Sequence, residues 1–127
     1  MAFSFKSDAD VIIVRAALFG PTAIVGQHLV LDTGSTKTVI SRELIQEAGY
    51  DLTRPLAQMS VATGSQIEIL PLFQIHCLMG LDQIRDQFVV IAHDLPASAI
   101  VDGVLGLDFL RNHRLSLDFR RGEIELS

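Results

Sequence analysis

The sequence has little of what membrane-spanning, disulfide-stabilised or nucleic-acid-binding proteins contain. Cys77 is the one cysteine in 127 residues, so no disulfide forms within the chain, which fits a reducing compartment. Charges, Gly or Pro interrupt the apolar residues, and no run reaches the roughly 18 to 20 residues that span a bilayer. The net charge of −5 contains no basic patch, which argues against nucleic acid as a partner. Residues 1–6 lack the layout of a signal peptide, so we expect a cytoplasmic protein.

The chain is instead rich in apolar residues for its size. Its length predicts a single domain over residues 1–127, large enough for a hydrophobic core but too small for two domains. Hydrophobic residues make up 49% of the chain. This excess predicts an extended interface between subunits, since such interfaces are more apolar than ordinary surface.

Patterns of short β-strands cover most of the chain. Apolar and β-branched runs bounded by turn signals recur about every 8 to 12 residues, which is typical of a mostly β, barrel-like domain. The runs predict strands at 11–19, 23–31, 36–40, 72–78, 87–92, 100–105, 114–119 and 123–126. Two short helices are predicted, one over 42–48 between an N-capping Ser41 and a terminating Gly49, and one over 107–112.

A β-hairpin is predicted over residues 59–69. Apolar and polar side chains alternate on both arms, and Thr63-Gly64-Ser65 supplies the turn between them.

One Asp-Thr-Gly triplet, Asp32-Thr33-Gly34, follows the apolar residues 29–31. Desolvation disfavours a charged carboxylate, so an aspartate in this setting is usually hydrogen-bonded, bound to a metal or part of a reactive pair. The four histidines are scattered and lack metal-ligand spacing, so we expect neither a metal nor another cofactor.

Three segments, in this order, resemble the aspartic protease family, especially its retroviral-type branch with single-domain bacterial members. They are Leu-Val-Leu-Asp-Thr-Gly-Ser-Thr at 29–36, the hairpin at 59–69, and Val-Leu-Gly at 104–106. The resemblance covers about residues 10–127. It implies a single retropepsin-like acid-protease barrel, mostly β and homodimeric, acting as an endopeptidase on a peptide or protein substrate.

The resemblance implies a catalytic site made of Asp32, Thr33 and Gly34. With one triplet per chain, the second carboxylate would be Asp32 of another copy, because a two-fold contact pairs a residue with itself. Thr33 would hydrogen-bond to the opposite loop, and the Gly34 N–H would donate to a carboxylate.

The resemblance also implies residues that contact substrate. Ser35 would add a hydroxyl hydrogen bond to the Asp32 carboxylate. The hairpin tip would act as a flap that closes over the substrate and excludes water. Its residues are Ala62, Thr63, Gly64 and Ser65. The substrate would lie extended between flap and floor, held by main-chain hydrogen bonds.

Two other interpretations are open at this stage. The domain could keep the pepsin-like fold without the chemistry, as a dimerisation or peptide-binding module. Residues 30–38 also resemble the Asp-x-Gly-x-Thr phosphate loop of the sugar kinase and actin superfamily. That fold normally needs two larger domains and a second phosphate loop, and this chain has neither.

Overall fold

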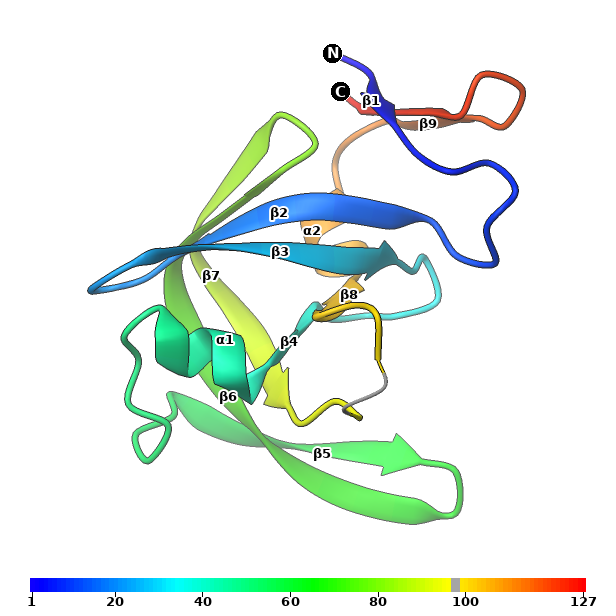
Figure 1. Cartoon of the computed structure of the whole chain (residues 1–127). Coiled ribbons are helices and arrows are strands. Elements are labelled where there is room, and N and C mark those ends of the chain that lie inside the picture. Colours follow the sequence, from blue (N-terminus) through cyan, green and yellow to red (C-terminus); the bar gives the residue numbers. More distant parts are fainter. Residues whose placement is uncertain (97–98) are drawn as a thin grey trace.

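The computed structural model describes residues 1–96 and 99–127 and confirms a mostly β chain with two short helices (Figure 1). In chain order the elements are β1 Phe3–Ser4, β2 Ile13–Phe19, β3 Ile24–Leu31, β4 Val39–Ser41, α1 Arg42–Glu47, β5 Ala57–Thr63, β6 Gln66–Gly80, β7 Gln83–His93, β8 Gly103–Leu105, α2 Leu107–Leu110, β9 Leu115–Asp118 and β10 Glu123–Leu126.

Six strands form a closed barrel. They pair in the order β2, β3, β8, β4, β7 and β6, and β2 also pairs with β6, which closes the sheet; β5 adds to β6 at the remaining edge. The interior follows from strand alternation, since Val14, Ala16 and Leu18 of β2 are buried while Arg15 between them is exposed. Phe109 of α2 is fully buried and packs into the same core.

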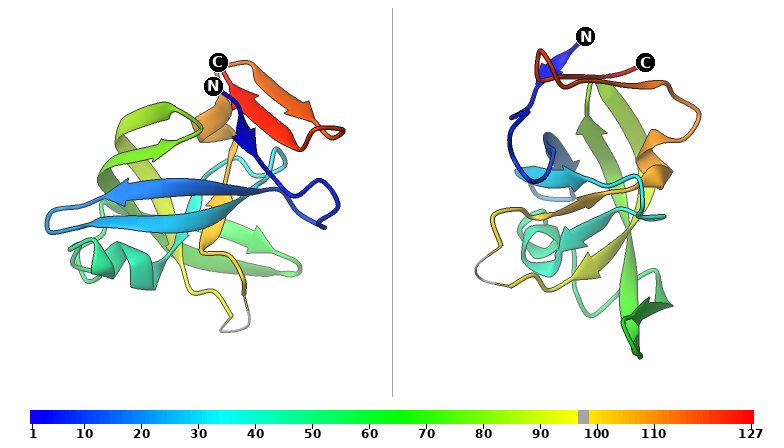
Figure 2. Two further views of the ribbon diagram at one scale, coloured as in Figure 1. Left: turned by 45° about the horizontal axis from the view of Figure 1, so that its top comes forward. Right: turned by 90° about the vertical axis from the view of Figure 1, so that its right-hand side faces the viewer.

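A second, three-stranded sheet joins the two ends of the chain. Its strand order is β1, β10, β9, with Phe3 opposite Ile124, and the termini lie near one another (Figure 2). The hairpin β9–β10 matches the predicted strands. Strand β1 is not predicted, because two residues are too few to show an alternating pattern.

The capping residues predicted for the first helix are confirmed. The Ser41 hydroxyl accepts a hydrogen bond from the Leu44 amide at 3.3 Å, and Gly49 follows the helix with a φ of +106°. Neither helix in the described part of the chain is long and apolar enough to cross a membrane.

The predicted hairpin is confirmed, but its second arm is longer than expected. Strand β6 continues through Pro71 to Gly80, where the sequence predicts a break and a separate strand. Pro71 lies opposite Gln58 of β5, and pairing with β7 begins only at Leu72, so the missing N–H of Pro71 interrupts no bond to β7.

Two strands begin three residues later in the structure than the sequence predicts. Residues 36–38 form the loop that precedes β4, and residues 100–102 bend before β8 begins at Gly103. A Cβ on Gly103 would collide with the carbonyl oxygen of Val39, so glycine allows β4 and β8 to approach closely.

Candidate active site

Asp32 begins the loop that follows β3. Its amide donates to the Leu105 carbonyl at 3.0 Å, which continues the parallel pairing of β3 with β8. The Gly34 amide donates to Asp32 Oδ1 at 2.8 Å, as the sequence predicts. Asp32, Thr33 and Gly34 are all exposed in the single chain. The loop therefore presents a carboxylate, oriented by a backbone N–H, on the surface of the barrel.

Ser35 acts on the loop rather than on the carboxylate. Its hydroxyl donates to the Lys37 carbonyl at 2.8 Å, so the hydrogen bond expected from Ser35 to Asp32 is not formed. The Ser35 carbonyl accepts from the Leu107 amide at 2.8 Å. Ser35 thus helps to fix the loop against the start of α2, and its contact with substrate stays a prediction.

Thr38 and Asp108 form a polar contact that the sequence analysis missed. Thr38 is fully buried, and its hydroxyl donates to Asp108 Oδ1 at 2.7 Å while accepting from the Gly106 amide at 3.1 Å. The Thr38 amide donates to Asp108 Oδ2 at 2.9 Å. The three residues hold the base of the Asp32 loop on the turn between β8 and α2.

Gly106 fits tightly in this contact. A Cβ at this position would lie 2.7 Å from the Lys37 carbonyl carbon and 2.9 Å from the Ser35 carbonyl oxygen. The Val-Leu-Gly segment recognised in the sequence therefore ends in glycine because two backbones approach each other there.

A cavity of about 420 Å³, here called the Asp32 cavity, opens beside the carboxylate. It is lined by Ala9, Asp10, Val11, Ile12, Val30, Leu31, Asp32 and Phe119. The carboxylate thus has a mainly apolar flank built from the N-terminal segment, the end of β3 and the turn after β9.

The tip of the β5–β6 hairpin lies elsewhere on the molecule. Figure 1 shows the tip and the loop after β3 on the same side of the barrel, but Ala62, Gly64 and Ser65 of the tip are not among the residues that line the Asp32 cavity. Ala62, Gly64 and Ser65 are exposed, and Gly64 has a φ of +63° as the turn requires. The side chain of Thr63 lies outside the described part of the structure.

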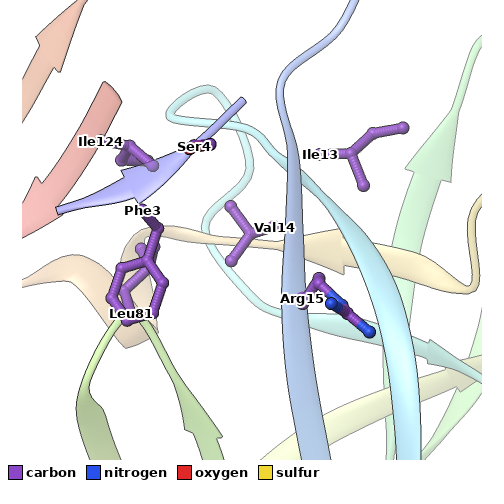
Figure 3. Close-up of a pocket in the computed structure, with 7 residues that line it drawn as sticks. All are labelled: Phe3, Ser4, Ile13, Val14, Arg15, Leu81 and Ile124. Atoms are coloured by element: carbon purple, nitrogen blue, oxygen red, sulfur yellow. The ribbon is translucent and has the colours of Figure 1, made fainter. Parts of the chain in front are cut away.

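A larger cavity, of about 460 Å³, lies between the terminal sheet and the barrel. Figure 3 shows its lining, which comprises Phe3, Ser4, Ile13, Val14, Arg15, Leu81 and Ile124. No carboxylate is among these residues. The candidate catalytic carboxylate therefore lies at the Asp32 cavity, although this cavity is the smaller of the two.

Shifted pKa values occur at other places in the fold. Burial raises the pKa of the Tyr50 hydroxyl and of the Cys77 thiol, and burial lowers the pKa of the Arg85 guanidinium. Hydrogen bonds from Thr53 lower the pKa of Asp51. None of these four groups lines the Asp32 cavity.

Comparisons with known proteins agree with this geometry. Residues 25–112 match the family model described as gag-polyprotein putative aspartyl protease. A retropepsin-like aspartic protease from Rickettsia conorii superposes with a TM-score of 0.73 at 14% sequence identity, covering 99% of this chain and 88% of that one. At this identity the likeness shows the fold, which confirms the predicted retropepsin-like class. No curated protein matches the sequence.

Proposed function

Because the chain belongs to the retropepsin-like aspartyl protease family, we propose that it is an aspartic endopeptidase that works as a homodimer. The observation that carries the proposal is the exposed Asp32, oriented by the Gly34 amide, in a chain with one Asp-Thr-Gly triplet. Aspartic proteolysis needs two adjacent carboxylates, and a two-fold axis through this loop supplies the second one.

The two Asp32 carboxylates would share one proton. The ionised carboxylate takes a proton from a bound water, whose oxygen forms a bond to the peptide carbonyl carbon. The protonated carboxyl group gives its proton to the carbonyl oxygen, which leaves a neutral tetrahedral intermediate. When the C–N bond breaks, the leaving nitrogen takes the proton that the first carboxylate removed from water. One hydroxyl of the intermediate gives its proton to the second carboxylate as the carbonyl forms again, which restores the shared proton. No metal and no covalent enzyme intermediate takes part.

The surroundings of the loop support a second copy as its partner. Thr33 and Gly34 are exposed, and so are Val11 and Phe119, two apolar side chains that line the Asp32 cavity. A partner that covers this surface would bury apolar area while bringing the two loops together. Thr33 would then hydrogen-bond to the opposite loop.

The β5–β6 hairpin would serve as the flap. It would close on an extended substrate from the side opposite the loop, and Ala62, Gly64 and Ser65 at its tip would meet the peptide backbone. The tip carries no aromatic side chain, so its contacts with substrate would be mainly through main-chain groups.

The test of the proposal is cleavage of a broad peptide library by the purified chain. We expect hydrolysis that a statine-type inhibitor blocks, because its hydroxyl group imitates the tetrahedral intermediate between the two carboxylates. Chelators and serine- or cysteine-directed reagents should leave the activity unchanged. If nothing in the library is cleaved at any pH, the chain is instead a peptide-binding or dimerisation module.

Activity per chain should depend on concentration. Below the dissociation constant of the dimer, we expect a tenfold dilution to lower the activity per chain by about tenfold, because a lone chain has half of the carboxylate pair. Initial rates measured over a dilution series, with sedimentation at the same concentrations, test this. A monomer that cleaves at the full rate per chain would contradict the dimer mechanism.

A further inference from the structure

His93, the last residue of β7, connects the proposed flap to the barrel. Its Nε2 lies 3.4 Å from Oε2 of Glu68, which belongs to the hairpin arm of β6. Its Nδ1 lies 2.6 Å from the carbonyl oxygen of Asp94. Glu68 stands opposite Val61 of β5, two residue pairs from the turn, so the contact reaches the outer half of the hairpin.

This outer half has little backbone support. Among the described residues, strand β6 pairs with β7 only from Leu72 onward, and β5 pairs with β6 alone. Residues 57–71 therefore form a two-stranded ribbon, and such ribbons are marginally stable without further contacts. A side-chain contact from the barrel to Glu68 would limit the movement of the ribbon.

Both contacts of His93 are hydrogen bonds at the same time only when the imidazole is charged. A carbonyl oxygen only accepts hydrogen bonds, so the contact with Asp94 places a hydrogen on Nδ1. An ionised carboxylate also only accepts, so the contact with Glu68 needs a second hydrogen on Nε2. A neutral imidazole carries a hydrogen on only one of its two nitrogens. When that hydrogen is on Nδ1, the lone pair of Nε2 faces the Glu68 carboxylate, and the two repel each other.

The charged groups near His93 come from three elements. Glu68 approaches from β6, and the Asp94 carboxylate follows His93 in the chain. Arg42 at the start of α1 lies 3.4 Å from the Asp94 carboxylate. The neighbour of His93 on β4 is the uncharged Ser41. Arg42 is therefore paired with Asp94, which leaves Glu68 as the acceptor for Nε2.

We propose that His93 is a positioning residue for the hairpin: its protonated ring holds Glu68, and with it the proposed flap, against the barrel. Because the link needs a hydrogen on both ring nitrogens, it holds while the ring is charged and is lost when the ring is neutral. The consequence for catalysis rests on the proposed function. A held hairpin binds substrate more tightly, so release raises KM and leaves kcat nearly unchanged.

Glu68→Gln gives a sharp test, because glutamine both donates and accepts. Its amide can donate to neutral Nε2 and accept from protonated Nε2, so the link should persist at every pH. We expect the KM of the wild type, divided by that of Glu68→Gln at the same pH, to rise about threefold from pH 5 to 7.5. The ratio cancels the titration of the Asp32 pair, which both proteins share.

Two further variants complete the kinetic test. His93→Leu should raise KM at both pH values. Its KM divided by that of Glu68→Gln should be the same at pH 5 and at pH 7.5. His28→Gln replaces an exposed histidine on β3 and should keep the wild-type ratio at both pH values. A wild-type ratio that stays constant between pH 5 and 7.5 would overturn the proposal.

A second measurement does not depend on activity. In an Asp32→Asn dimer, which cannot digest itself, the amide NMR signals of residues 66–70 should change position between pH 5 and 7.5. Adding the His93→Leu substitution should remove this pH-dependent change in the NMR signals. If these NMR signals do not change with pH while the wild type cleaves peptides, the proposed His93–Glu68 link is wrong and the proposed function stands. If the signals do change with pH while no peptide is cleaved, the His93–Glu68 link is supported and the proposed function fails.

Discussion

Replacing Asp32 with Asn is expected to lower peptide hydrolysis by about two to four orders of magnitude while leaving the dimer intact. Asparagine keeps the size of the side chain and its oxygen acceptor for the Gly34 amide, so the loop geometry is preserved. It removes the group that exchanges a proton with water and with the peptide carbonyl. Steady-state rates on one cleaved peptide, with sedimentation of both proteins, measure the two effects separately.

Asp10→Asn is the matched control, because Asp10 is the other carboxylate that lines the Asp32 cavity. If the dyad consists of Asp32 from each chain, Asp10→Asn should retain most of the activity. A loss as large as that of Asp32→Asn would place the second carboxylate on the same chain. Full activity in Asp32→Asn would exclude the proposed mechanism.

Thr38→Val is expected to lower the free energy of unfolding by about 2 to 4 kcal/mol and kcat by about 10- to 100-fold. Valine has nearly the shape of threonine but no hydroxyl, so the Gly106 amide and Asp108 Oδ1 each lose a buried partner. The base of the Asp32 loop then loses part of its attachment to α2. Urea unfolding at one fixed protein concentration measures the stability, since the dimer makes it concentration-dependent.

Thr38→Ser separates the hydrogen bonds from the packing. Serine keeps the hydroxyl and loses one methyl group, which costs about 1 kcal/mol. We expect its kcat to stay close to that of the wild type. Equal losses of stability and kcat in the Ser and Val variants would show that packing, and not the hydroxyl, positions the loop.

Local sequence patterns were sufficient for most of the elements. Alternation in β2 follows from a strand with one buried face, and it is visible within a few residues. The β5–β6 hairpin is predicted from the same two-residue period around a glycine turn, although Ile67 and Ile69 on its second arm are exposed in the single chain. The cap at Ser41 and the glycine at position 49 are likewise decided by hydrogen bonds within one turn. The Asp-Thr-Gly and Val-Leu-Gly segments indicated the fold family for the same reason, since each is a short contiguous motif.

Other features depend on contacts between distant residues. The turn from β6 to β7 uses Leu81 and Asp82 with positive φ values of 50° and 63°, although neither is glycine. Pairing of the two long arms imposes this conformation, so the turn residues alone did not predict it. Strand β1 forms only because β10, at the other end of the chain, offers it an edge.

The sequence by itself determined that a single Asp-Thr-Gly carboxylate lies at the end of an apolar strand in a mostly β domain. Apolar periodicity and turn residues act over a few neighbouring positions, so they can be recognised from the sequence without knowledge of the tertiary structure. Only the tertiary structure decided that Thr38 and Asp108, 70 residues apart, hold the Asp32 loop, and that Ser35 turns to Lys37. It also brought His93 to Glu68. Those contacts arise from the barrel packing that brings distant strands together, and no local pattern encodes them.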